Sequence, residues 1–362
     1  MKIVHMTSVH GRYDTRIFKK ECVSLKKKYD TVYLLVADGN NNEKHNNIDI
    51  IDVGSYKNRL YRIIVAPIKI YIRALKLRAQ IYHYHDFELA IVSLLLKISG
   101  KKVIYDVHED LPNDILYKPW INKNIRNTLS YFVNILELFI AKKMDAIITP
   151  TDYIAKRFRV VNNKTITIKN FPILININKQ KRIEGDYICY VSSNFIEVRG
   201  IKELIYAMEN IKTKLFLVGN MPNTDYINNL KKEPGWKRVK EFGLIKQEEV
   251  FKIIENSICG INLCYPTKTY MNAIPTKIFE YMMFGIPVIS SNLPIEKEII
   301  EGNNCGLCVN PFSSEEIEGA INFIINNRTE AERMGCNGIS AIKNRYSWEK
   351  EELKLFDIYS NI

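Results

Sequence analysis

Short apolar runs of β type alternate with helix-length segments along the 362 residues of this chain, and the alternation begins twice. In the first half, the predicted strands are Lys2–Ser8, Thr31–Ala37, Ile81–His85, Lys102–His108, Asp145–Pro150 and Thr165–Lys169. In the second half, they are Tyr187–Ser192, Lys214–Gly219, Arg238–Phe242, Cys259–Leu263 and Pro287–Ser290. Strands that alternate with helices are typical of parallel sheets covered by helices on both faces. The sequence therefore predicts an α/β protein with two doubly wound, Rossmann-like parallel-sheet domains.

The segment Phe171–Asp186 interrupts this alternation with proline, asparagine and charged residues, and we place the domain linker there. We predict an N-terminal domain over residues 1–175, a C-terminal domain over 186–345 and a last helix over 346–362 that crosses back to the first domain. Ligands of open parallel sheets bind at the carboxyl ends of the strands, near the point where the strand order reverses. Two facing sheets are expected to leave a cleft between the domains. The asparagine-rich tract Asn40–Asn47 is interpreted as a loop.

The formal net charge of +12 suits a partner that carries phosphate groups, such as nucleic acid, an anionic membrane surface or a nucleotide-linked substrate. Composition alone does not choose among these three. Nucleic-acid-binding proteins often interleave clustered cations with aromatic residues along one face, and no such motif is found in this sequence. The nucleic-acid alternative is therefore not favoured.

The seven cysteines are scattered and odd in number, as expected where thiols stay reduced. Cys305 and Cys308 form a CxxC pair, but no second pair or histidine pair at zinc spacing accompanies them, so we predict neither a metal nor a redox site there. The amino terminus lacks the features of a signal peptide, and no run of about 18 uncharged apolar residues occurs. We expect a cytoplasmic protein that does not span a membrane.

Residues 272–290, NAIPTKIFEYMMFGIPVIS, predict a short helix from about Pro275 to Phe284, followed by a buried strand. Lys277 and Glu280 are three residues apart and share one face of this helix. A lysine in the first helical turn opposes the helix dipole, which is easier to understand if the ammonium and the free backbone N–H groups hold a phosphate. Glu280 could then accept hydrogen bonds from sugar hydroxyls. The equally weighted alternative is an ordinary intrahelical ion pair.

Arg199 and Gly200 stand immediately before another predicted helix, after the first strand of the second domain. Gly200 permits a close approach of the backbone, and the Arg199 guanidinium can bind two phosphate oxygens. Two cations at helix starts in one sheet, Arg199 and Lys277, suit a diphosphate, which needs more than one point of neutralisation. This pair favours a nucleotide-diphosphate ligand.

In the first domain, the segment VIYDVHED places His108 just past a strand end, where ligands of such sheets bind. His108 could bind a reacting sugar or transfer a proton, or it could be an ordinary loop histidine. In HYHDFEL, Asp86 is interpreted as a structural cap of the following helix, and the role of His85 is left open. Although His83, His85 and His108 are potential ligands, parallel strands give no reason for their nitrogens to converge. We therefore predict no metal site.

Gly11 lies in a loop between the first strand and a basic helix, where backbone N–H groups could hold a phosphate or an acceptor. The loop matches neither the GxGxxG dinucleotide fingerprint nor the GxxxxGK[ST] phosphate loop, which argues against dehydrogenases and P-loop NTPases. The sequence also lacks GxSxG and kinase signatures.

Between residues 60 and 76, apolar residues recur at helical spacing and form a stripe along one face of a predicted helix. Basic residues occupy another face of the same helix. The stripe consists of Leu60, Ile63, Ile64, Pro67, Ile68, Tyr71, Ile72 and Leu75. The basic residues are Arg62, Lys69, Arg73 and Lys76. We slightly favour a helix packed on the sheet, bent at Pro67, with a solvated basic side. The alternative is a surface that rests on anionic lipid and brings the site to a lipid-linked glycan.

The segments KIVHMTSVHGRYDTRIFKKE, HYHDFEL, VIYDVHED, VRGIKELI and PTKIFEYMMFGIPVIS together resemble the retaining, GT-B-type glycosyltransferases of family four. The chain resembles especially the bacterial members that assemble capsule, lipopolysaccharide and other surface polysaccharides. The resemblance spans nearly the whole chain. It implies an acceptor-binding N-terminal domain and a C-terminal domain that binds a UDP- or GDP-linked sugar. It also implies a cytoplasmic enzyme that works at the inner face of the cell membrane.

The resemblance further implies roles for single residues: Arg199 and Lys277 on the donor diphosphate, Glu280 on the donor ribose, and His108 near the reacting carbon. The implied catalytic residues are His108, Arg199 and Lys277. The implied donor-binding residues are Gly11, Arg199, Asn272, Ile274, Pro275, Thr276, Lys277 and Glu280. Asn272 departs from the family, because many of its members have a glutamate there, eight positions before the second glutamate.

The implied reaction retains the anomeric configuration, and the departing diphosphate itself helps to deprotonate the acceptor. It needs no enzymic nucleophile, no metal on the diphosphate and no cofactor. Two further alternatives are left open. Asn272 fits a catalytically silent GT-B subunit, and a sugar-nucleotide epimerase has a similar two-sheet architecture.

Overall fold

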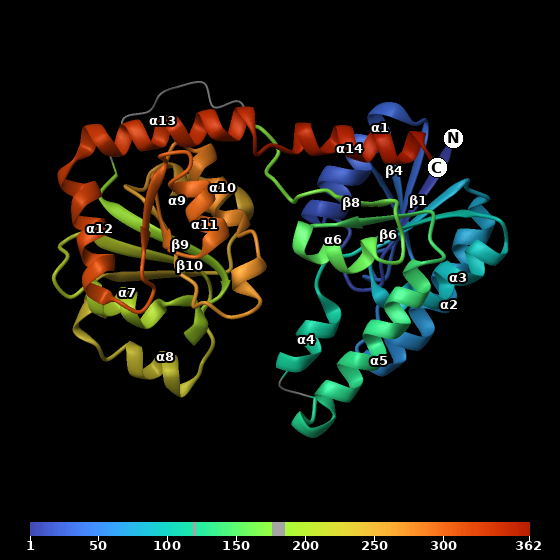
Figure 1. Ribbon diagram of the computed structural model, residues 1–362, viewed down its shortest axis with the longest axis horizontal. Helices are drawn as coiled ribbons and strands as arrows, with labels where there is room; N and C mark the ends of the chain where they lie inside the picture. The colour runs from blue at the N-terminus through green and yellow to red at the C-terminus, as the bar shows by residue number, and fades with distance from the viewer. Residues whose placement is uncertain (119–120, 176–184) are drawn as a thin grey trace. The chain divides into compact units, whose positions relative to one another are not determined.

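The computed structural model describes residues 1–118, 121–175 and 185–362 (Figure 1). The chain divides into two compact units: one comprises Met1–Asn170 and Trp348–Ile362, and the other comprises Phe171–Ser347. Each unit contains one sheet of mostly parallel strands, with helices on both faces. The predicted fold class, with two Rossmann-like parallel-sheet domains, is confirmed.

The N-terminal unit contains an eight-stranded sheet in the order β3-β4-β2-β1-β5-β6-β7-β8. The strands are β1 (Lys2–Met6), β2 (Thr31–Val36), β3 (Glu43–His45), β4 (Ile48–Asp52), β5 (Ile81–Tyr84), β6 (Lys102–Asp106), β7 (Ala146–Thr149) and β8 (Thr165–Thr167). All neighbours pair in parallel except β3 and β4. Six of these strands start within one residue of the predicted position and end one or two residues earlier.

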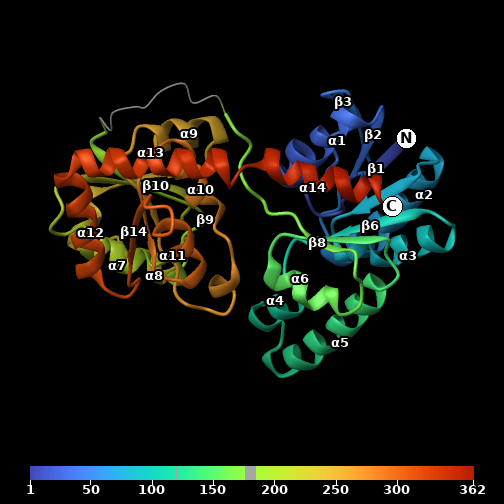
Figure 2. The same ribbon diagram turned by 45° about the horizontal axis from the view of Figure 1, so that its top comes forward.

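The helical elements of this unit are η1 (Thr15–Cys22, a π-helix), α1 (Val23–Lys28), α2 (Arg59–Leu77), η2 (Phe87–Leu89), α3 (Ala90–Ile98), α4 (Leu111–Tyr117), α5 (Lys123–Ala141), α6 (Asp152–Arg159) and α14 (Trp348–Ser360). Helices α2, α3, α5 and α6 pack on one face of the sheet. η1, α1 and α14 pack on the other face, where α14 lies beside α1 (Figure 2). Because strand residues alternate between faces, Val4 points to the first face, whereas Ile3 points to the second.

The hairpin β3–β4 was not predicted, because its first strand lies in the asparagine-rich tract that was interpreted as a loop. The two-residue turn consists of Asn46 and Asn47, and both have left-handed backbone angles, with φ of 48° and 59°. Asparagine tolerates this conformation better than most residues and is favoured in tight hairpin turns. The Asn-Asn pair was therefore a usable turn signal.

Helix α2 corrects another prediction, because most of the apolar stripe does not pack on the sheet. The residues that α2 buries are Ala66, Pro67, Ile70 and Ala74. Of the predicted stripe, only Pro67 is buried, and Leu60, Ile64 and Ile68 are 73%, 63% and 54% exposed. Ala66 and Ala74 let the helix approach the sheet closely around Ile70, and most of the other large apolar side chains remain on its outer side.

The C-terminal unit contains a six-stranded parallel sheet in the order β11-β10-β9-β12-β13-β14. The strands are β9 (Tyr187–Asn194), β10 (Lys214–Asn220), β11 (Val239–Gly243), β12 (Gly260–Asn262), β13 (Val288–Ser291) and β14 (Gly306–Val309). The helical elements are η3 (Glu197–Arg199), α7 (Ile201–Ala207), α8 (Asp225–Leu230), η4 (Pro234–Arg238), α9 (Gln247–Glu255), η5 (Tyr270–Asn272), α10 (Thr276–Met283), α11 (Pro294–Ile300), α12 (Ser314–Asn326) and α13 (Arg328–Asn344). Helices α7, α8 and α12 cover one face, and α9, α10, α11 and α13 cover the other.

Helix α10 begins and ends within one residue of its predicted bounds. Gly285 has a φ of 69°, which terminates the helix, and Pro287 prevents its continuation. In the part of the chain that the structure describes, every helix is too short or too polar to cross a membrane. All seven cysteines are free, and Cys305 is buried beside β14.

Candidate functional site

The strand order of each sheet reverses at one point. Most of the predicted site residues follow the strands on either side of it, and His108 follows the next strand, β6. In the N-terminal unit, the reversal lies between β1 and β5. In the C-terminal unit, it lies between β9 and β12. Since ligands of open α/β sheets bind at the carboxyl ends of such strands, each unit has one favoured ligand position.

In the N-terminal unit, Asp86 organises the loop that follows β1. Its carboxylate accepts hydrogen bonds from the backbone N–H groups of Ser8 at 2.6 Å and Val9 at 3.1 Å, and from the Thr7 hydroxyl at 2.7 Å. It also pairs with Nδ1 of His10 at 2.9 Å. The predicted cap is therefore wrong, because the Asp86 side chain makes no capping bond to η2. Burial alone would raise the pKa of Asp86, but the His10 pair and these donors lower it to about 2.

His108 and His85 meet at one carboxylate, that of the fully buried Asp106. His108 Nε2 lies 3.0 Å and His85 Nδ1 3.1 Å from Asp106 Oδ2. Arg16 binds both oxygens of Asp106, at 2.7 and 2.8 Å. Burial would raise the pKa of Asp106, but the guanidinium of Arg16 holds it well below its usual range. The ring of His10 lies 4.6 Å from that of His108, so three histidines surround the strand ends.

Gly11 lies in the same loop, one residue after His10. A Cβ atom at Gly11 would meet no protein atom within 4 Å, and its φ is not in the left-handed region. The fold itself therefore does not require glycine at this position, which leaves room for a ligand beside the backbone. His10 and Arg16 were not predicted as site residues. The loop-plus-basic-helix pattern was the only sequence signal for them.

A cavity of about 610 Å³ opens beside these histidines and lies wholly within the N-terminal unit. Its polar lining residues are His10, His85, Asp86, Glu88, His108 and Glu109, with Arg59, Arg62 and Lys118. Its apolar lining residues include Ile63, Ile91, Leu94, Leu136 and Phe139, which come from α2, α3 and α5. The cavity therefore joins the histidines to the outer side of these three helices.

In the C-terminal unit, Arg199 lies in η3, just after β9, and Gly200 turns the chain into α7 with a φ of 58°. The Arg199 guanidinium lies over the ring of Tyr270, 4.8 Å from its centroid, and 3.6 Å from the sulfur of Cys264. Its Nε is buried without a hydrogen-bond partner. Among the described residues, no carboxylate lies within 4.0 Å of it. This guanidinium is thus a partly buried, uncompensated cation at the strand-order reversal.

Tyr270 connects Arg199 to the other predicted residues, because η5 leads directly into α10. Asn272 donates a hydrogen bond to the carbonyl of Lys268 at 2.9 Å. Ile274, Pro275 and Thr276 follow, and all three are partly exposed. In α10, Lys277 Nζ lies 2.9 Å from Glu280 Oε2, so the intrahelical pair that the spacing predicted is present. An ammonium has three donors, so this pair leaves Lys277 able to bind a phosphate as well.

A buried polar cluster beneath Arg199 was not predicted. The Glu296 carboxylate accepts a hydrogen bond from Ser290, and the Asn262 amide donates to the same hydroxyl at 2.9 Å. Burial raises the pKa of Glu296 to about 7, although its hydrogen bonds and the charge of Arg199 oppose this rise. These residues come from three different elements, so no local motif could reveal them.

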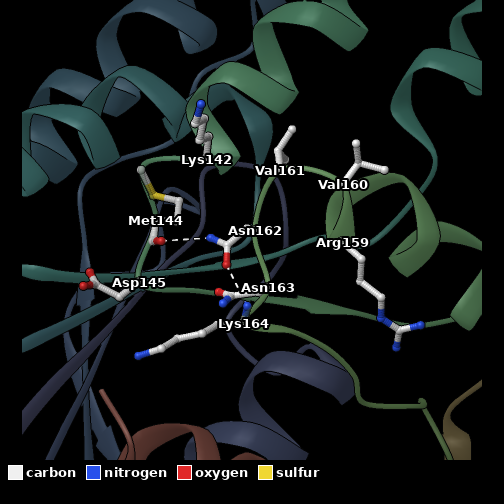
Figure 3. Close-up of a pocket in the computed structure, with 9 residues that line it drawn as sticks. All are labelled: Lys142, Met144, Asp145, Arg159, Val160, Val161, Asn162, Asn163 and Lys164. Atoms are coloured by element: carbon white, nitrogen blue, oxygen red, sulfur yellow. Dashed lines mark hydrogen bonds between the residues drawn. The ribbon is translucent and has the colours of Figure 1, made fainter.

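A second depression in the N-terminal unit lies at the amino ends of β7 and β8, around the loops that lead into these two strands (Figure 3). The Asn162 amide donates hydrogen bonds to the carbonyls of Ala141 and Met144, at 3.0 and 2.9 Å. Its oxygen accepts one from the backbone N–H of Lys164 at 2.9 Å. Asn162 thus joins two loops, which is a structural role.

Two family models match the chain, one in each half. The model described as Glycosyltransferase Family 4 matches residues 3–171, and the model described as Glycosyl transferases group 1 matches residues 174–341.

Solved structures match over nearly the whole chain. A sucrose-phosphate synthase from Thermosynechococcus elongatus is 17% identical, with 99% of this chain and 98% of that chain covered and a TM-score of 0.75. Anabaena HepE in complex with UDP-glucose is 15% identical, with both chains covered completely and a TM-score of 0.73. A structure described as trehalose-6-phosphate from E. coli bound with UDP-2-fluoro glucose is 11% identical, with 99% of each chain covered and a TM-score of 0.68. At these identities the similarity shows the fold alone.

Proposed function

Because the chain is a glycosyltransferase of the GT-B fold, similar to family 4, we propose that it transfers a sugar from a nucleotide-diphosphate donor to a glycan or lipid-diphosphate-linked acceptor. The reaction retains the anomeric configuration and serves the assembly of a cell-surface polysaccharide such as capsule or lipopolysaccharide. The enzyme acts in the cytoplasm, at the inner face of the membrane.

The donor is a UDP- or GDP-linked sugar, bound by the C-terminal unit. Similar solved structures contain UDP, UDP-glucose and UDP-2-fluoro glucose, which supports a uridine donor. Arg199 and Lys277 bind the diphosphate, and Glu280 binds the ribose. Asn272 and the segment Ile274–Thr276 provide the neighbouring donor contacts.

The observation that carries this proposal is the uncompensated charge of Arg199 at the β9–β12 reversal. A partly buried cation without a carboxylate is costly, and a bound diphosphate would compensate it. The start of α10 adds backbone N–H groups and Lys277 after the neighbouring strand, β12. A diphosphate leaving group gains negative charge as its bond to the sugar breaks, so preorganised cations stabilise the transition state.

The protein therefore needs no nucleophile of its own and no metal on the diphosphate. The departing phosphate oxygen takes the proton of the acceptor hydroxyl. His108, oriented by the buried carboxylate of Asp106, contacts the donor sugar near its reacting carbon.

The acceptor binds in the 610 Å³ cavity of the N-terminal unit. Its histidine end suits the sugar that receives the transfer, and Arg59, Arg62 and Lys118 in its lining suit the charge of a lipid diphosphate. The apolar residues from α2, α3 and α5 then contact the first part of the lipid chain.

The outer side of these three helices, here called the apolar face, rests on an anionic membrane. Its exposed apolar residues are Leu60, Ile64, Ile68, Ile72, Ile91, Leu95, Ile98, Ile125, Phe132, Leu136 and Phe139. Exposed basic side chains on α2, namely Arg59, Lys69, Arg73 and Lys76, supply the charge that anionic headgroups attract. Apolar side chains next to basic ones are typical of surfaces that lie in the membrane interface.

The donor site is tested by thermal shift with UDP-, GDP-, ADP- and CMP-sugars, because a ligand that binds only the folded state raises the melting temperature. We expect one nucleotide family to stabilise the wild type. In Arg199→Ala and Lys277→Ala, its affinity should fall by about 10- to 100-fold, since a hydrogen bond to a charged group contributes about 1.5–3 kcal/mol. Arg333→Ala and Lys297→Ala are matched controls, because both cations form exposed helical ion pairs in the same unit.

The two alternatives give different results. An epimerase would convert the donor sugar without an acceptor, and its product would keep the nucleotide. A silent subunit would bind the nucleotide sugar without hydrolysing or transferring it, and Asn272→Glu is the variant that tests whether Asn272 causes this. If no nucleotide sugar shifts the melting temperature of well-folded wild type, the transferase proposal is overturned.

A further inference from the structure

Three histidines and one glutamate form a cluster inside the N-terminal unit, beneath the strand ends that carry the acceptor cavity. His5 lies on β1, His83 and His85 lie on or just after β5, and Glu21 lies on η1. His5 and His83 are register partners on neighbouring parallel strands, so their side chains point to the same face. His5, His83 and Glu21 are fully buried, and His85 is 3% exposed. The expectation that the nitrogens of His83, His85 and His108 would not converge is wrong for His83 and His85, which meet at Glu21, and His108 approaches His85 on its other side.

The four side chains direct one atom each toward a common point. His5 Nδ1, His83 Nδ1 and His85 Nε2 each lie 3.9 Å from Oε2 of Glu21. His5 Nδ1 lies 2.9 Å from His85 Nε2. In a tetrahedral zinc site with bonds of about 2.0–2.1 Å, the ligand atoms lie about 3.3 Å apart, and the observed separations fall on both sides of that value.

In two of these histidines, the ring nitrogen that points away from the cluster contacts a polar side chain, as is common for metal-binding histidines. His85 Nδ1 lies 3.1 Å from Asp106 Oδ2, the carboxylate–histidine arrangement that orients metal ligands in many proteins. His5 Nε2 lies 3.3 Å from the hydroxyl of Tyr359, on α14. Both outer contacts leave the opposite nitrogen directed at the cluster. The cluster-facing Nδ1 of His83 lies 2.8 Å from the Tyr359 hydroxyl, so a bound ion would replace this hydrogen bond.

Charge also favours a cation at this point. Asp106 is neutralised by two short bonds from Arg16, whereas Arg16 approaches Glu21 only at Oε1, at 3.3 Å. Neither oxygen of Glu21 has a hydrogen-bond partner among the described residues. Arg16 thus pairs with Oε1, whereas Oε2, the oxygen that faces the three histidines, has no cation beside it in the described part of the chain, and a buried carboxylate oxygen in this state favours a bound metal ion.

We propose that His5, His83, His85 and Glu21 bind a divalent transition-metal ion, with zinc the best match for three imidazoles and one carboxylate. The ion is structural: all four positions are taken by protein atoms, so no position is left for substrate. It holds η1 against β1 and β5, and through His85 and Asp106 it fixes His108. This ion is separate from the donor diphosphate, which lies with Arg199 in the other unit.

The full-length protein, expressed without a histidine tag in zinc-supplemented medium, is dialysed and its metal measured by plasma mass spectrometry. We expect about one zinc per chain in the wild type and less than about a tenth in Glu21→Gln and His83→Asn. His45→Asn, which changes an exposed histidine of β3, should retain the wild-type content. Co²⁺ substituted for zinc should give the intense visible absorption of a four-coordinate ion in wild type and in His45→Asn only.

Because a buried variant could fail to fold, the wild type is tested alone as well. It is unfolded with chelator and refolded with Zn²⁺, with Mg²⁺ or without metal. We expect a higher melting temperature with Zn²⁺ only. Wild type that carries no stoichiometric metal and melts identically in all three conditions overturns the proposal. Zinc that remains at the same level in folded Glu21→Gln also overturns it, because the ion would then be bound elsewhere.

Discussion

Glu296 is almost fully buried near the start of α11, and its pKa of about 7 lies above the ordinary 4.5. Because the folded state holds the proton more tightly than the unfolded state, this residue's stability contribution is complete below about pH 4.5 and is lost as pH rises through about 7. The difference in pKa corresponds to about 3 kcal/mol.

We predict that Glu296→Gln removes this pH dependence, since glutamine resembles the protonated acid in shape and is always neutral. Urea denaturation at pH 5 and pH 8.5 measures the effect: the free energy of unfolding should fall by about 3 kcal/mol between these values in wild type and by much less in the variant. Glu298→Gln, on the exposed side of the same helix, is the control and should behave as wild type. Equal pH dependence in Glu296→Gln would contradict the assigned pKa.

At the scale of elements, α2 can be tested for whether its apolar stripe packs in the protein or contacts an anionic membrane. We predict that the double change Ile64→Glu and Ile68→Glu lowers binding to anionic vesicles at least tenfold in a flotation assay, because two apolar contacts with the interface become charged. The melting temperature should change little, since both side chains are more than half exposed.

The matched control is Leu353→Glu on α14, which is 64% exposed and lies on the other face of the sheet. It should leave vesicle binding unchanged. If α2 instead packed its stripe in the protein, the double change would cost about 2–5 kcal/mol for each side chain, and a large drop in melting temperature would reveal it.

The bounds of elements were easier to predict than their environment. Pro275 and Gly285 mark the ends of α10 through local backbone chemistry, so the sequence was sufficient there. In α2, periodicity identified the helix but not its buried face, because Ala66 and Ala74 are too small to dominate an apolar pattern. Which side of a helix is buried depends on the partner surface, which a local pattern does not contain.

The candidate site, too, could be predicted from the sequence only where local motifs determine it. Sequence motifs predicted Arg199 and Lys277 from their places at helix starts and His108 from its place past a strand end, and these roles stay predictions. The motifs did not find the cluster around Glu21, because it depends on the register of β1 against β5 and on a helix far away in sequence. The role of Asp86 was also missed, since its partners lie in a loop nearly 80 residues away.

At the scale of the whole molecule, the chain returns to its first unit after completing the second. Helix α14 buries four large side chains against the β sheet of the N-terminal unit: Trp348, Leu355, Ile358 and Tyr359. The Trp348 indole N–H donates a hydrogen bond to the Ser24 hydroxyl at 2.8 Å. The Tyr359 hydroxyl lies 2.8 Å from His83 Nδ1, within the histidine cluster. The last helix is therefore part of the N-terminal core.

We predict that residues 171–347 fold alone, whereas residues 1–170 do not. The fragment 1–170 leaves the α14 side of its sheet uncovered. Burying each of the four α14 side chains contributes about 1.5–3 kcal/mol to the free energy of unfolding. Their sum, about 6–12 kcal/mol, is comparable to the whole stability of a typical domain, about 5–15 kcal/mol.

Joining residues 348–362 to 1–170 through a flexible linker should restore a cooperative thermal transition, followed by circular dichroism. The same fusion with Trp348→Ala should lose about 3–5 kcal/mol, and a cooperative transition in residues 1–170 alone would show that α14 is dispensable.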